Sequence, residues 1–183
     1  NPNRCCHFPI TLCDKIEHRN KLIVDEVIDF HKKGFPVLVI LFSPQEIDDI
    51  HDLIKNHPEF NSKQKIRIYQ GNNIKLKPSN DSGKEGAISL GTNVCGRGFH
   101  IEVDKKHLHV IVSFYSSNNR TLQQAFERTA RKNNFGSVHI ICLKDEFNAK
   151  RKFIENEEIV DNLKKMEIYK NMQKQFIDEF KNV

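Results

Sequence analysis

Pro36-Val37-Leu38-Val39-Ile40-Leu41-Phe42 is a continuous apolar run, and Ser43-Pro44-Gln45-Glu46 follows it directly. A strand that is apolar at every position is typical of a parallel sheet covered on both faces. The polar tetrapeptide matches a helical capping box with proline at the first helical position. Together the two stretches predict a buried parallel strand that leads straight into a helix.

The same strand and helix alternation extends to both sides of this run. Apolar residues at helical spacing predict a helix from about Lys15 to Lys33, which Gly34 ends. The helix after Ser43 is expected to face inward with Ile47, Ile50 and Ile54. Further strands are predicted at residues 66–69, 87–90, 108–114 and 138–143. We therefore expect an α/β fold with a five-stranded, mainly parallel sheet between helices, in which residues 36–42 are central.

Length and composition fit one globular domain with an appendage. The 183 residues are 38% hydrophobic and 29% charged, with a net charge of +5. We place the domain at residues 1–147 and a helical extension at residues 148–183. No run is long and apolar enough to span a membrane. Five cysteines without the spacing of a disulfide framework favour free thiols and a reducing compartment. The opening residue, Asn1, is not Met, and we take it as an internal boundary of a longer polypeptide.

Two segments predict a surface that faces phosphate groups. The strand near Ala87 runs into Thr92-Asn93 and then Gly96-Arg97-Gly98, where glycine allows close approach and arginine suits phosphate oxygens. A helix predicted from about Asn118 to Asn134 follows another apolar strand, at whose carboxyl end open α/β sheets bind ligands. One face of this helix carries Arg120, Gln124, Arg128 and Arg131, and the opposite face carries Leu122, Phe126 and Thr129. The alternative interpretation is a solvated amphipathic helix.

These segments resemble the second nucleotide-binding domain of the SecA preprotein translocase motor. The family signature Thr-Asn-x-x-Gly-Arg-Gly-Thr-Asp-Ile is matched by Thr92, Asn93, Gly96, Arg97, Gly98 and Ile101. The family's Leu-His-Val-Ile strand and its Gln-x-x-Gly-Arg-x-Gly-Arg helix are similar to Leu108-His109-Val110-Ile111 and to Gln124, Arg128 and Arg131. The family's Gly-Gln-Pro-Val-Leu-Val and opening Pro-Thr-Asn-Arg look like residues 34–39 and 1–4. The resemblance covers residues 1 to about 147 in one order.

The resemblance implies a RecA-like three-layer sandwich and a role in ATP-driven protein transport. In such a motor an N-terminal RecA-like half of the same polypeptide binds ATP and Mg²⁺, and this half supplies Arg128 and Arg131 as catalytic residues at the γ-phosphate. Nucleotide-binding positions carried over from the family are Gly96, Arg97, Gly98, His100 and Gln124. The implied partners are that N-terminal half, a preprotein or other protein substrate, and a membrane translocon. The implied location is the cytoplasm or another reducing compartment, peripherally at a membrane.

Departures from the family pattern leave the activity open. Phe99-His100 stands where the family has Thr-Asp, and Glu127 and Ala130 replace glycines of the arginine helix. Glu127 lies four residues before Arg131 and can pair with its guanidinium. No P-loop motif occurs in the chain, so by itself it is expected to hold no cofactor and to hydrolyse no ATP. The alternatives are a non-catalytic interaction domain derived from SecA, or half of a nucleic-acid helicase. Nucleic acid is disfavoured because no basic stripe interleaved with aromatic residues is evident.

Two further patterns are set aside. Residues 23–29 imitate a magnesium-binding acidic strand, but their apolar spacing is helical and favours a solvated helix. The histidines lack metal-binding spacing, so no metal site is expected, and we interpret them as surface or strand residues: His51, His57, His107, His109 and His139.

Overall fold

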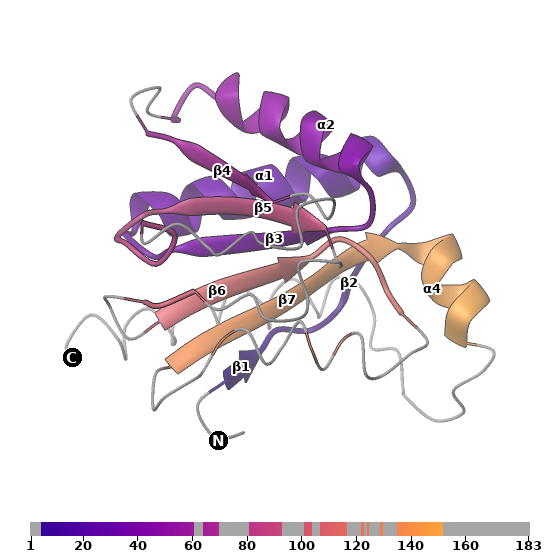
Figure 1. The fold of residues 1–183 in the computed structure, drawn as a ribbon. Coiled ribbons are helices and arrows are strands. Elements are labelled where there is room, and N and C mark those ends of the chain that lie inside the picture. The colour runs from indigo at the N-terminus through magenta and orange to yellow at the C-terminus, as the bar shows by residue number, and fades with distance from the viewer. Residues whose placement is uncertain are drawn as a thin grey trace.

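The computed structural model describes residues 5–60, 64–69, 81–92, 101–103, 107–116 and 135–151, together with the single residues 122, 124 and 129. Within this part a seven-stranded sheet carries two helices on one face and a third at one end (Figure 1). The strands are β1 (Cys5–His7), β2 (Thr11–Cys13), β3 (Val37–Leu41), β4 (Ile66–Tyr69), β5 (Ile88–Thr92), β6 (His107–Val112) and β7 (Phe135–Leu143). The helices are α1 (Ile16–Lys32), α2 (Pro44–Lys55) and α4 (Lys144–Arg151).

Every strand pair in the described sheet is parallel, which confirms the predicted α/β class. The strand order is β1-β7-β6-β3-β5-β4, so β3 is central as predicted, between β5 and β6. The carboxyl ends of these three strands are in line, because Leu41 pairs with Thr92 and Ile40 pairs with Val112.

The prediction of five strands is wrong, because β1 and β2 also join the sheet. Each is three residues long, and both pair with the nine-residue β7, at Gly136–Val138 and at Ile141–Leu143 respectively. A three-residue strand that is only partly buried has no apolar run to reveal it. Pairing with a long partner, rather than local sequence, decides that these residues become strands.

Gly34 ends α1 in the way the sequence predicts. Its φ of 83° lies in the left-handed region that favours glycine. The Gly34 N–H donates to the His31 carbonyl, and the Phe35 N–H donates to the Phe30 carbonyl, both at 3.0 Å. The rings of Phe30 and Phe35 lie 6.0 Å apart. This bond pattern with its apolar contact is a Schellman motif, which turns the chain sharply from α1 toward β3.

The capping box predicted before α2 is also confirmed, with one difference. The Ser43 Oγ accepts from the Glu46 N–H at 3.3 Å, and Pro44 occupies the first turn. The Glu46 carboxylate accepts from the Phe42 N–H at 3.2 Å, one residue before the usual partner. The carboxylate therefore also holds the chain segment by which β3 passes into α2.

The hydrophobic core is divided by the sheet into two clusters. Val37, Val39 and Leu41 of β3 face α1 and α2, while Leu38 and Ile40 face the opposite side. The inward residues predicted for α2, Ile47, Ile50 and Ile54, are fully buried. In Figure 1 both helices lie over the same face, with α1 against β2, β3 and β7, and α2 against β3 and β5. On the other face the described residues include Ile101, Leu122 and Phe147 of α4.

Other predictions concern the chemistry of the chain and its boundaries. None of the four cysteines in the described part forms a disulfide: Cys5, Cys6, Cys13 and Cys142. The described residues contain no helix long and apolar enough to cross a membrane, and no cluster of side chains arranged to hold a metal ion. The boundary predicted at residue 147 falls within α4 (Lys144–Arg151), and residues 152–183 lie outside the described part.

Candidate functional site

The candidate site is the carboxyl edge of the sheet, where β3, β5 and β6 end together. Strand β5 ends at Thr92, immediately before the predicted nucleotide loop. Most of the predicted site residues lie outside the described part of the chain: Gly96, Arg97, Gly98, His100, Arg128 and Arg131. Gln124 is described, and it is helical and half-buried. The assignment of these residues to nucleotide therefore stays a prediction.

Two described residues of the segment that the sequence predicts as an arginine helix are buried. Leu122 and Thr129 are buried, at 7% and 4% exposure. The Thr129 hydroxyl donates to the Leu108 carbonyl of β6 at 2.6 Å. Both belong to the face that the sequence predicted to pack inward, and the third, Phe126, lies outside the described residues.

A buried ionic network lies at the same edge. Arg19, near the start of α1, is 2% exposed, and its guanidinium donates to the Glu46 carboxylate at 3.4 Å and to the Ser113 carbonyl at 3.3 Å. It also donates twice to the Asn20 side chain, at 3.2 and 2.9 Å. The Ser113 hydroxyl donates to Glu46 at 2.9 Å. A buried charge needs this degree of pairing, because an unpaired one would cost several kcal/mol.

This network fixes the geometry of the carboxyl edge. Glu46 belongs to α2, Arg19 to α1, and Ser113 directly follows β6. Through Glu46, which also accepts from Phe42, the ends of β3 and β6 are held against both helices. The capping box pointed to Glu46, but no sequence signal pointed to Arg19 or Ser113.

An aromatic surface extends beside this network. Phe42 is 64% exposed, and its ring lies 5.8 Å from Phe114 in an edge-on arrangement. The Lys150 ammonium lies 5.8 Å from the Phe42 ring, within cation–π range, and donates to the Tyr115 carbonyl and to Glu146. The carboxyl edge therefore presents an exposed aromatic ring beside a positive charge.

A second buried cluster lies deeper, between α1 and the strands β6 and β7. The Glu26 carboxylate lies 2.7 Å from Nε2 of His109 and 2.8 Å from Nδ1 of His139. Nδ1 of His109 lies 2.6 Å from the Ser137 hydroxyl, and Thr11 of β2 lies 2.9 Å from Nε2 of His139. The ring of His109 also stacks on Phe30, with centroids 3.7 Å apart.

The protonation of this cluster follows from its hydrogen bonds. Burial favours the neutral form of Glu26, but the charge of His139 and the hydrogen bonds from His109 and His139 outweigh it and hold the pKa of Glu26 far below its usual range. Burial lowers the pKa of His109 despite its bond to Glu26, so this ring is neutral. An ionised carboxylate only accepts, so Nε2 of His109 carries the proton and Nδ1 accepts from Ser137.

Ser137, His109 and Glu26 have the order of a catalytic triad, but the site is closed. Ser137 and His109 are 0% exposed, so no substrate can reach the hydroxyl. The cluster instead fixes α1 on the sheet. His107, His109 and His139 are strand residues, as predicted, but the interpretation of residues 23–29 as a solvated helix is wrong at Glu26, which is 7% exposed. The sequence placed Glu26 on the helix, but it did not show that this carboxylate would be buried against His109 and His139.

The sequence of this chain is similar to those of protein translocase subunits. No protein-family profile matches the chain. The chain is 27% identical over 136 residues to the protein translocase subunit SecA of Lachnoclostridium phytofermentans. The matched region covers 70% of this chain and 16% of that protein. It is 26% identical over 149 residues to SecA of Desulforapulum autotrophicum, covering 76% of this chain and 17% of that protein. The chain thus spans about a sixth of the length of these relatives.

Solved structures agree on the fold. Domain 2 of the DEAD-box helicase Mss116p, bound to an RNA duplex, matches with a TM-score of 0.59 and 20% identity over 86% of this chain and 61% of that chain. S. cerevisiae Dbp5 bound to RNA and ADP BeF3 matches with a TM-score of 0.59 and 15% identity over 92% of this chain and 45% of that chain. The chain is therefore a distant homologue of SecA over much of its length, with the RecA-like fold of a helicase C-terminal domain.

Proposed function

We propose that this chain is the C-terminal RecA-like half of a SecA-like, ATP-driven protein translocase motor. The observation that carries the proposal is the match to SecA along 136 to 149 residues, 70% to 76% of the chain, together with the helicase-type fold. A match of this extent is not limited to one motif. It supports SecA-like protein transport ahead of other motors that share the fold.

The proposed chemistry takes place at the carboxyl edge of the sheet. An N-terminal half with a P-loop would bind ATP and Mg²⁺ against this edge. Arg128 and Arg131 would then stabilise the charge that develops on the γ-phosphate, as arginine fingers do in related motors. The Arg19–Glu46–Ser113 network supports this role because it holds the ends of β3 and β6 in fixed positions. A fixed edge lets the closing of two halves be transmitted to a protein substrate.

The test uses the full polypeptide that joins this chain to a P-loop half. Replacing Arg128 or Arg131 with Ala should lower ATP turnover by roughly three to five decades and leave ATP binding nearly unchanged, because a finger acts mainly in the transition state. Arg120→Ala is the matched control, since Arg120 lies on the same predicted helix but outside the family motif, and its turnover should stay within about twofold. Normal turnover in both test variants would show that the two arginines are structural.

A second candidate function is half of a nucleic-acid helicase. It is favoured by the solved structures of the same fold, which hold RNA, and by the net charge of +5. Single-stranded RNA that stimulates ATP turnover in the full polypeptide, with an effect that falls steeply with salt, would support this candidate. Stimulation by an unfolded preprotein and not by RNA would support the translocase.

A third candidate is a non-catalytic interaction domain. Its basis is His100, which stands where the family has an aspartate, and Glu127, which can hold Arg131 away from phosphate. Glu127→Gly in the full polypeptide separates the two cases. An active motor should gain turnover, whereas an inactive domain should show none before or after the change.

A further inference from the structure

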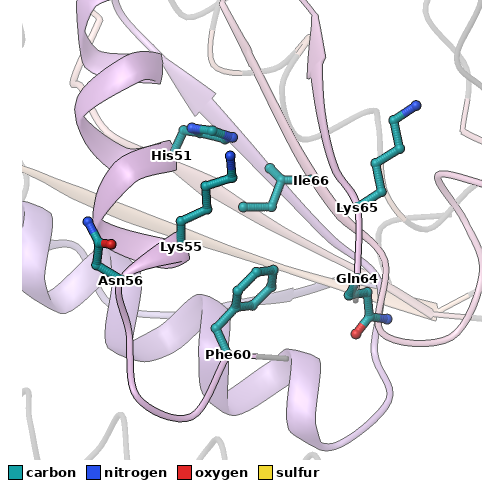
Figure 2. Close-up of a pocket in the computed structure, with 7 residues that line it drawn as sticks. All are labelled: His51, Lys55, Asn56, Phe60, Gln64, Lys65 and Ile66. Atoms are coloured by element: carbon teal, nitrogen blue, oxygen red, sulfur yellow. The ribbon is translucent and has the colours of Figure 1, made fainter. Parts of the chain in front are cut away.

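A pocket of about 400 Å³ lies at the opposite edge of the sheet from the candidate site (Figure 2). Helix α2 starts after the carboxyl end of β3 and runs back toward the amino edge, where its last turn lines the pocket together with Ile66, the first residue of β4. The lining residues come from that turn and from the segment before β4: His51, Lys55, Asn56, Phe60, Gln64, Lys65 and Ile66. The pocket is therefore remote from the surface that the proposed function uses.

The pocket combines an apolar floor with two exposed lysines. Phe60 and Ile66 are half-buried and pack against the core with their inner sides. Figure 2 shows Phe60, Ile66 and Lys55 pointing toward the same space. Lys55 and Lys65 are exposed, and neither forms an ion pair with a described residue, in contrast to Lys32, which pairs with Glu59. The floor has room for one apolar side chain beside an anionic group.

The surroundings of the pocket favour a few spaced carboxylates over a continuous chain of phosphates. Asp52, which is 74% exposed, pairs with His51 at the rim, and Glu59, which is 54% exposed, precedes Phe60. These carboxylates interrupt the positive surface around the two lysines, and the Asp81 carboxylate also interacts with Lys65. A continuous polyanion laid across this surface would be repelled on both sides of the pocket.

The adjoining strand favours an extended peptide as the occupant. The sheet order ends at β4, which among the described strands pairs only with β5. Its outer edge begins at the pocket, and Ile68 on this strand is 39% exposed. An extended peptide can add to such an edge by main-chain hydrogen bonds while alternate side chains enter an adjoining pocket.

We infer that this pocket is a docking site for an extended, acidic segment of a partner protein. One apolar side chain of the segment rests on Phe60 and Ile66. Carboxylates two positions to either side of it, which lie on the same face of an extended segment, pair with Lys55 and Lys65. Docking at the amino edge leaves the carboxyl edge open, so the partner and a nucleotide-binding half can engage the chain at the same time.

The inference is tested with the full 183-residue chain and a short fluorescein-labelled peptide, Glu-Ser-Leu-Ser-Glu, which places the leucine and both glutamates on one face when extended. Binding is titrated by fluorescence anisotropy. We expect a Kd on the order of 0.1 mM, which weakens with salt. Lys55→Glu should weaken binding at least tenfold. Lys21→Glu is the matched control, because it changes the net charge equally at an exposed position of α1 and should leave the Kd within about twofold.

Two further arms locate and identify the ligand. Amide chemical shifts should change in residues 51–56 and 64–69, and a peptide with glutamine in place of glutamate should bind at least tenfold more weakly. Wild-type binding that is absent at millimolar peptide, or that is unchanged by Lys55→Glu, would overturn the inference. So would a single-stranded oligonucleotide that binds more tightly than the peptide and depends on Lys55, since this would assign the pocket to nucleic acid.

Discussion

Single buried side chains decide how this fold responds to acid. The buried Glu26 carboxylate forms hydrogen bonds with the imidazole rings of both His109 and His139. His107 is also buried, and its Nε2 lies 3.3 Å from the Ser137 hydroxyl. Burial and the nearby His109 lower the pKa of His107 to about 3. The folded protein therefore keeps His107 and His109 neutral at acidic pH values at which the unfolded chain would protonate them.

We predict that the free energy of unfolding falls as the pH drops from 7.5 to 5. In the unfolded chain His107 and His109 titrate near their usual pKa of about 6.5, while in the folded protein both values are lower. Between these values the unfolded chain binds more protons, so stability declines with acid. His107 alone should account for roughly 2 kcal/mol at pH 5, at about 1.4 kcal/mol per pH unit. Urea unfolding at several pH values measures this slope.

The source of the slope is identified with variants. His107→Gln should flatten the curve below pH 6.5, whatever its effect on stability at pH 7.5. His51→Gln is the control for the loss of a histidine that lies outside the buried cluster. Equal slopes in the wild-type protein and the His107→Gln variant would show that burial of this ring does not set the acid response.

At the scale of elements, the junctions between helices and strands are local in origin. The Schellman motif at Gly34 and the capping box at Ser43 lie on either side of β3, the central strand. Both depend on residues a few positions apart, so the sequence shows them directly. The Schellman motif sets the angle between α1 and β3, and the capping box sets the angle between β3 and α2.

We predict that Gly34→Ala lowers the free energy of unfolding by about 1 to 2 kcal/mol, because a side chain at φ of 83° is strained. The new Cβ would also lie 2.7 Å from the Glu85 carboxylate, but this is the end of a flexible side chain that can move. Adding Glu85→Ala should therefore recover little of the loss. Full recovery in the double variant, measured by urea unfolding, would instead assign the cost to the steric contact. Lys33→Ala is the neighbouring control and should change stability by less than about 0.5 kcal/mol.

At the scale of the molecule, the two edges of the sheet carry different chemistry. The carboxyl edge holds the Arg19–Glu46–Ser113 network, exposed Phe42 and the strand that leads to the predicted nucleotide loop. The amino edge holds the basic pocket beside the terminal strand β4. This separation agrees with the proposal that nucleotide and partner protein act at different ends of one sheet.

We predict that the chain alone binds ATP weakly and does not hydrolyse it. The sequence has no P-loop, and His100 replaces the carboxylate that the family directs at the nucleotide. Calorimetric titration of the 183-residue chain with Mg·ATP should give a Kd above about 1 mM. Micromolar affinity would contradict the prediction. The His100→Asp variant would then show whether this position contributes to ATP binding, because a carboxylate that contacts the nucleotide should lower the Kd further.

The sequence by itself determined the α/β class, the central position of β3, the two helices beside it and their caps. These features depend on apolar runs, helical spacing and turn residues within a few positions of one another, and the structure confirms them. The resemblance to SecA was also visible in the order of short motifs. The roles of Arg128 and Arg131 stay predictions, because these residues lie outside the described part.

Only the tertiary structure decided the short strands β1 and β2, the burial of Glu26 and Arg19, and the pocket beside β4. Glu26 meets His109 from 83 positions away and His139 from 113 positions away, and Arg19 meets Ser113 from 94 positions away. A carboxylate on a predicted helix is expected to be solvated, because the sequence does not show which hydrogen-bond donors the fold brings to it. Because burial of charge depends on partners remote in the chain, local patterns predicted the scaffold but not the polar clusters that fix its helices on the sheet.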